Sequence, residues 1–168
     1  MGSVTFNGMC QKSATKTKAP PTLAQIRHHY IHQLRDNDVQ VIKLGQTMRI
    51  VLLTYSLFNP NSANMQQRYR PVMRTLARLM HTYDKVTVKV AAYTNSGNNM
   101  KRAQALTTRQ AQVVARYLWS RGINARLEYA VGFNQQNPVG WNGSAMGRHF
   151  NRRIEISFRF YPKSIPYA

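Results

Sequence analysis

Residues 88–97 read V-K-V-A-A-Y-T-N-S-G, residues 106–118 read L-T-T-R-Q-A-Q-V-V-A-R-Y-L, and residues 151–158 read N-R-R-I-E-I-S-F. The first stretch alternates apolar and polar residues, as a half-buried strand does, and ends in a polar turn. The second has apolar residues at helical spacing, and the third alternates strictly after an asparagine and two arginines. These stretches predict a strand, an amphipathic helix and a closing strand.

The flanking sequence extends this alternation of helices and strands. We expect helices at 23–34, about 67–81 and about 101–120, and strands at 39–44, 48–54, 86–93, 125–132 and 153–160. Residues 56–62 and 133–149 are expected to be loops. The β-α-β-α-β-β order predicts an α+β fold, a two-layer sandwich with helices on one face of a mixed sheet.

Composition divides the chain into four parts. Residues 1–21 are rich in Ser, Thr, Lys and Pro without apolar periodicity, which is typical of a flexible tether. Residues 22–55 are expected to form a short helix and a strand hairpin that pack on the main domain. That domain is predicted to span 56–161, and residues 162–168 form a tail.

The charge balance restricts the partners. Twenty-four Lys and Arg residues face five acids, which gives a formal net charge of +19. Such a surface attracts nucleic acid, anionic lipid, lipopolysaccharide or an acidic cell-wall polymer. No predicted helix concentrates the basic residues and no pair of exposed aromatics marks an RNA-binding strand, which argues against nucleic acid.

The sequence contains no clear set of catalytic residues or metal ligands. The five acids are scattered with no paired carboxylates, and no Ser/His/Asp set is suggested. His28 and His32 have the i, i+4 spacing of two metal ligands, but no third ligand is near them in the sequence, so a solvated or packed helix face is preferred. We therefore predict a protein that is not an enzyme and has no metal or cofactor.

The lone cysteine, Cys10, excludes an internal disulfide and allows two interpretations. It is either an incidental free thiol or a lipid-modified residue at the head of an envelope protein, although the preceding Asn-Gly-Met is a poor lipidation signal. No apolar run approaches the ~18 residues of a membrane span. The first nine residues are too short and polar for a signal peptide, so a cytosolic protein and a trimmed signal both stay open.

Five motifs in order identify a family resemblance. They are Leu57-Phe58, Ala92-Tyr93-Thr94-Asn95, Leu106-Thr107-Thr108-Arg109-Gln110-Ala111, Gly132-Phe133 with Asn137-Pro138, and Asn151-Arg152-Arg153-Ile154-Glu155. The segment from 56 to 160 thereby resembles the OmpA-like domain, the peptidoglycan-associated module of bacterial envelope proteins. The resemblance implies non-catalytic binding of the peptidoglycan stem peptide, whose diaminopimelate residue is held by an aspartate and an arginine.

The resemblance also names the candidate binding residues, which are Thr94, Asn95, Gly97, Leu106, Arg109, Gln110, Asn151 and Arg153. Asn95 stands where the family has its aspartate, and Gln110 stands where the family has its arginine. Losing both charges is expected to weaken binding by about one to three orders of magnitude. Arg109 points about 100° around the helix from Gln110 and is not expected to replace the missing arginine. Arg153 either contacts a carboxylate or pins the adjacent loop.

Two functional hypotheses follow from the resemblance. The domain either still rests against peptidoglycan, helped by its positive surface, or has become a protein-docking module that does not need peptidoglycan. The segment from Thr22 to about Leu53 and the leader cysteine are also similar to the OmpA-like lipoprotein of the Dot/Icm type IVB secretion apparatus. That finer similarity implies a periplasmic, outer-membrane-associated accessory protein, with secretion-complex proteins as partners and a lipid on Cys10.

Overall fold

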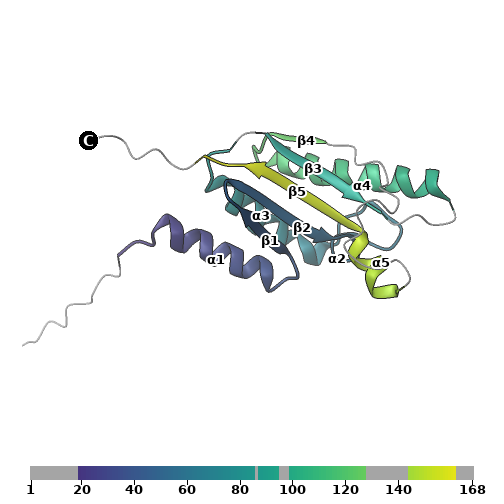
Figure 1. Ribbon diagram of the computed structural model, residues 1–168, viewed down its shortest axis with the longest axis horizontal. Helices are drawn as coiled ribbons and strands as arrows, with labels where there is room; N and C mark the ends of the chain where they lie inside the picture. Colours follow the sequence, from purple (N-terminus) through teal and green to yellow (C-terminus); the bar gives the residue numbers. More distant parts are fainter. Residues whose placement is uncertain (1–18, 86, 95–98, 128–143, 162–168) are drawn as a thin grey trace, which may run out of the picture.

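The computed structural model describes residues 19–85, 87–94, 99–127 and 144–161 (Figure 1). The elements in chain order are α1 (Leu23–Arg35), β1 (Gln40–Leu44), β2 (Thr47–Leu53), α2 (Thr54–Leu57), the 3-10 helix η1 (Gln67–Tyr69), α3 (Arg70–His81), β3 (Val88–Tyr93), α4 (Met100–Ser120), β4 (Ala125–Leu127), α5 (Ala145–Asn151) and β5 (Arg153–Arg159).

A five-stranded sheet in the order β1-β2-β5-β3-β4 forms one layer of the molecule. Strand β3 pairs with β4 in parallel, and all other pairs are antiparallel. The β1–β2 hairpin belongs to this sheet, because β2 lies along the whole of β5, from Thr47 opposite Arg159 to Leu53 opposite Arg153. The mixed sheet and its helices confirm the predicted α+β sandwich.

Helices α3 and α4 lie behind the sheet in Figure 1 and cover one of its faces. The strand side chains on that face are almost completely buried and are contributed by β2, β3 and β5: Met48, Ile50, Leu52, Val88, Val90, Ala92, Ile154, Ile156 and Phe158. Burial of such side chains stabilises a fold by about 1.5–3 kcal/mol each. Helix α1 packs against α3 and β1, so three helices and the sheet share one core.

The ends of the helices show why the sequence folds as it does. Thr22 caps α1 in a capping box with Gln25, as its position before the apolar stripe predicts. At the end of α4, Gly122 adopts a φ of +73°, which an L side chain rarely adopts. The Ile123 N–H donates to the Leu118 carbonyl at 3.0 Å and the Gly122 N–H donates to the Trp119 carbonyl at 2.9 Å. These two bonds form a Schellman motif that ends the helix at the predicted glycine.

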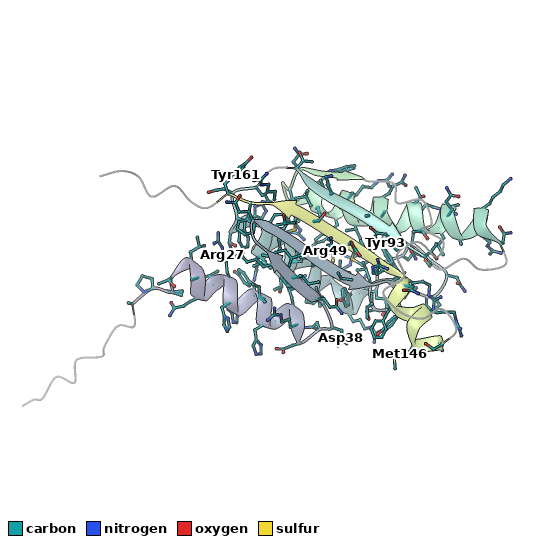
Figure 2. The ribbon with its side chains drawn as sticks, viewed as in Figure 1. Arg27, Asp38, Arg49, Tyr93, Met146 and Tyr161 are labelled. Carbon is teal, nitrogen blue, oxygen red and sulfur yellow. The ribbon has the colours of Figure 1, made fainter. Side chains whose placement is uncertain are left out.

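The other face of the sheet carries polar and charged side chains beside a few apolar ones, and Figure 2 labels two of its residues, Arg49 on β2 and Tyr93 on β3. The Arg153 Nε donates to Glu155 Oε1 at 2.7 Å, and its guanidinium lies 4.1 Å from the Tyr93 ring centroid. The Arg49 Nε lies 3.9 Å from Glu155 Oε2. Only 5% of Arg153 is exposed, so this arginine belongs to a cluster internal to the fold.

Two segments predicted as loops contain parts of short helices, so these predictions were wrong at residues 56–57 and 145–149, while residues 133–143 lie outside the described residues. Helix α2 occupies the start of the 56–62 segment, and α5 occupies the end of the 133–149 segment. The Ser144 Oγ accepts the Gly147 N–H at 2.9 Å at the start of α5, as an N-cap side chain does. With seven residues and a glycine among them, α5 is too short to show helical periodicity in the sequence.

Several predictions fall outside the described residues. They concern Cys10 and most of the tether, Asn95 and Gly97, the Gly132-Phe133 and Asn137-Pro138 motifs, the later part of the 125–132 strand, and the 162–168 tail. The four-part division of the chain stays a prediction. Within the described parts of the chain, no helix combines the length and the apolar character needed to cross a membrane.

Candidate functional site

A groove of about 1350 Å³ lies between α4 and the loop that follows α2. Its lining residues come from α2 and the following loop, the end of β3, one side of α4 and the start of β5: Thr54, Tyr55, Phe58, Asn59, Pro60, Asn61, Ser62, Ala63, Asn64, Tyr93, Thr94, Asn99, Arg102, Ala103, Leu106, Thr107, Arg109, Gln110, Gln112, Val113, Arg116 and Arg152. Four of the eight predicted site residues are among them: Thr94, Leu106, Arg109 and Gln110.

Backbone hydrogen bonds shape the loop wall of the groove, residues 59–64. The Asn59 N–H donates to the Asn64 carbonyl at 3.0 Å, and the Asn64 N–H donates to Ser62 Oγ at 2.9 Å. Asn61 has a φ of +51°, a conformation that asparagine tolerates better than most residues. Phe58 and Met65 form an isolated antiparallel bridge at the base of the loop. The loop therefore presents amide and hydroxyl groups from a hydrogen-bonded turn.

Gln110 connects α4 to that loop. Its Nε2 donates to the Ser62 carbonyl at 2.8 Å, and only 5% of the residue is exposed. The amide that replaces the family's arginine is thus engaged in an internal hydrogen bond across the groove. Gln110 sets the distance between the two walls.

The other motif positions on α4 support the floor of the groove. Thr107, at the position of the family's serine, is buried and donates through Oγ1 to the Ala103 carbonyl at 2.8 Å. Leu106 is half-buried beside it. At the start of the helix the Asn99 side chain accepts the Arg102 N–H at 3.1 Å, which caps the first turn. These bonds fix the Thr107 side chain against its own helix and cap the first turn of α4.

Arg109 and Gln110 both line the groove although one helical step of about 100° separates them. The groove is wide enough to include two adjacent rows of α4 side chains. Arg102 and Arg116 line it as well, each seven residues from Arg109, and all three arginines are exposed. No acidic residue is among the lining residues that the structure describes.

The closing motif contributes to the groove through its first arginine. Arg152 lines the groove, whereas Asn151 is buried and Arg153 lies in the cluster with Glu155 and Tyr93. The Arg152 carbonyl accepts the Thr54 N–H at 3.1 Å, which fixes the start of β5 beside α2. The structure therefore brings Arg152, and not the predicted Arg153, to the site.

The sequence analysis predicted Arg109 but did not predict that Arg102, Arg116, Arg152 or the loop of residues 59–64 would line the groove. The expectation that no helix concentrates the basic residues was wrong, because α4 aligns Arg102, Arg109 and Arg116 along the groove. Their constant seven-residue spacing is a signal that the sequence contains. The contribution of residues 59–64 depends on a contact between positions 48 residues apart, which no local pattern predicts.

Comparisons with known proteins agree with this geometry. The chain is 26% identical over 125 residues to the probable lipoprotein YiaD of Escherichia coli, covering 74% of this chain and 57% of that protein. It is 26% identical over 99 residues to the peptidoglycan-binding protein ArfA of Mycobacterium tuberculosis, covering 59% of this chain and 30% of that protein. The chain thus spans little more than half of the length of YiaD and less than a third of the length of ArfA.

Solved structures share the fold. The cell wall anchor of the type VI secretion system from Pseudomonas aeruginosa superposes with a TM-score of 0.66 at 24% identity, over 84% of this chain and 99% of that one. The periplasmic domain of Helicobacter pylori MotB superposes with a TM-score of 0.60 at 19% identity, over 78% and 85%. The sequence model of the OmpA family matches residues 57–152, which is more than half of the chain. The chain belongs to the OmpA family.

Proposed function

We propose that this protein is a non-catalytic, peptidoglycan-associated component of the bacterial cell envelope. The observation that supports this most is the groove, where Thr94 from one family motif and Leu106 and Gln110 from another line one cavity. The name of the mycobacterial relative describes a peptidoglycan-binding protein, and residues 57–152, which match the OmpA family model, include most of the residues that line the groove. The positive lining suits the carboxylates of a stem peptide.

The direct test is cosedimentation of the full chain with purified peptidoglycan sacculi. We expect the chain to pellet with sacculi at an ionic strength near 0.15 M, where contacts between exposed charges beyond about 8 Å are screened. A chain that stays in the supernatant would contradict the proposal. Strong retention on duplex DNA with none on sacculi would favour a nucleic-acid-binding protein instead.

The replaced charges have their own test. The double substitution Asn95→Asp/Gln110→Arg restores the family's charged pair, and we expect about tenfold tighter binding of a diaminopimelate stem peptide because charge-assisted hydrogen bonds are stronger than neutral ones. Arginine at position 110 must also donate to the Ser62 carbonyl for the loop to keep its place. Unchanged affinity in a variant with unchanged thermal stability would show that the lost charges do not limit binding.

The setting of the protein is the finer part of the proposal. We infer an accessory, outer-membrane-associated component of a Dot/Icm type IVB secretion apparatus, similar to DotK (IcmN), with Cys10 as the lipid anchor. Support comes from the helix and hairpin that precede the family domain and from the leader cysteine. Copurification with outer-membrane core-complex proteins and Cys10-dependent incorporation of labelled palmitate test the two parts. A free, unlipidated monomer would contradict both.

A further inference from the structure

Arginine recurs every seven residues along α4, at positions 102, 109 and 116. Seven residues advance an α-helix by about 10.5 Å and fall about 20° short of two full turns. The three side chains therefore project from nearly one line that is about 21 Å long. All three are exposed and all three line the groove. We call Arg102, Arg109 and Arg116 the arginine row.

The arginine row has no counter-charge in the described parts of the protein. The described carboxylates lie elsewhere: Asp36 and Asp38 follow α1, Asp84 follows α3, and Glu155 binds Arg153 on the opposite sheet face. None of the ion pairs between described residues includes a member of the row. Exposed arginines about 10 Å apart repel one another only weakly at 0.1 M salt, because that distance is close to the screening length. An anionic ligand along the groove would remove this repulsion.

The wall that faces the arginine row is chemically different. Asn59, Asn61, Ser62 and Asn64 present amide and hydroxyl groups there, and the half-exposed Tyr55 lies at its α2 end. Gln110 holds this wall at a fixed distance from α4. Neutral hydrogen-bonding groups suit the hydroxyl and acetamido groups of a glycan, whereas guanidinium groups suit carboxylates. The groove thus matches a polymer that is neutral on one side and carries spaced anions on the other.

We propose that the arginine row binds carboxylates on successive stem peptides of one peptidoglycan strand, so that recognition is multivalent and not centred on one zwitterionic residue. This inference rests on the proposed function and specifies the ligand of the same groove. Each exposed arginine–carboxylate contact contributes little affinity by itself. Once the first contact has formed, the other carboxylates of the same strand are held near the remaining arginines, so the three contacts together give a much higher affinity. Multivalency compensates for the two charges that Asn95 and Gln110 lack relative to the family.

The test compares two triple variants of the full chain. Arg102→Gln/Arg109→Gln/Arg116→Gln removes the arginine row, and Arg70→Gln/Arg74→Gln/Arg78→Gln removes three exposed arginines of α3 that do not line the groove. Each variant loses three charges, so their nonspecific attraction to an anionic polymer falls equally. We expect the α4 variant to bind sacculi at least about tenfold more weakly than the α3 variant. Equal affinities would overturn the proposal.

Chemical treatment of the sacculi identifies the anion. Conversion of their carboxylates to amides is expected to lower binding of the unmodified chain about tenfold, whereas removal of phosphate-containing polymers with acid is expected to leave it unchanged. The reverse pattern would overturn the assignment to carboxylates. If the unmodified chain does not bind untreated sacculi, the proposed function fails; if it binds and the two triple variants are equal, only the arginine row fails.

Discussion

Gln110 shows how a substitution at a binding position also changes the architecture of the site. In the family resemblance this position carries an arginine that faces the ligand. Here the buried amide donates to the Ser62 carbonyl and ties α4 to the loop of residues 59–64. The groove therefore keeps its width through an internal bond, and positive charge enters it from Arg102, Arg109, Arg116 and Arg152.

The Gln110→Ala substitution tests this role. It removes a buried hydrogen bond and leaves a small cavity, so we expect the free energy of unfolding to fall by about 1–2 kcal/mol. Binding to sacculi should weaken as well, because the loop wall loses its link to α4. Gln112→Ala, on the same helix and without a hydrogen bond to another described residue, is the control and should change stability by less than about 0.5 kcal/mol. Equal losses in urea unfolding would contradict the role of Gln110.

The buried phenol of Tyr69 is expected to make the stability of the fold depend on pH in the alkaline range. Burial, followed by the charges of Asp38 and Tyr55, raises the pKa of the Tyr69 phenol, whose oxygen donates to the Asn37 carbonyl at 3.3 Å. A phenol whose folded pKa exceeds its unfolded value of about 10 stabilises the fold fully below that pH. The contribution is lost as the pH rises from about 10 toward the folded pKa.

The measurement is urea unfolding of the native chain and of Tyr69→Phe between pH 8 and 11. We expect the native chain to lose more stability over this range than the variant. Burial lowers the pKa of Lys85, which acts in the opposite sense near pH 10 and is present in both proteins. Parallel pH profiles for the two proteins would show that Tyr69 does not carry the effect.

The residues at the family motif positions predicted only part of the groove. The family motifs name Thr94, Leu106, Arg109 and Gln110, and the structure places these four along one groove because they follow from a strand end and one helix. Arg153 was a candidate on the same grounds, yet its buried side chain pairs with Glu155 over the Tyr93 ring and does not line the groove. Arg152 immediately precedes β5 and Arg153 begins it, so a difference of one position decides which of the two arginines lines the groove.

At the scale of elements, strong periodicity predicted the structure well. Helix α1, helix α4 and strand β5 begin or end within one residue of their predicted bounds, since each has a long apolar face or strict alternation. Helices α2 and α5 were missed because four and seven residues are too few to show a period. Their formation depends on caps and neighbours, such as the Ser144 side chain and the start of β5.

The glycine that ends α4, Gly122, can be tested by substitution. Gly122→Ala places a side chain at a φ of +73°, where nothing lies within 4 Å of the added methyl, so the cost is conformational and not steric contact with a neighbour. We expect a loss of about 1 kcal/mol and a fall in Tm of about 2–4 °C. Gly122→Asn is the matched variant and should lose less, because asparagine adopts this conformation more readily. A loss that is equal in both variants would show that φ is not the cause.

At the scale of the whole molecule, the β1–β2 hairpin is structurally inseparable from the family domain. Strand β2 is the antiparallel partner of β5 along seven residues and contributes Met48, Ile50 and Leu52, which are fully buried. Loss of these three side chains, at roughly 1.5–3 kcal/mol each, approaches the total stability of about 5–15 kcal/mol expected for a domain. The segment that matches the family, residues 57–152, contains neither β2 nor β5.

Truncation tests this dependence. A fragment of residues 56–161 would leave the β5 edge opposite β3 unpaired and would remove the three β2 side chains from the core. We therefore expect no cooperative urea unfolding and weak binding to sacculi. A fragment of residues 19–161 keeps every described element and should unfold cooperatively like the full chain. If the shorter fragment unfolded cooperatively and bound sacculi as tightly as the longer one, residues 22–55 would be an addition to a self-sufficient domain, because β5 would then need only β3 as a partner.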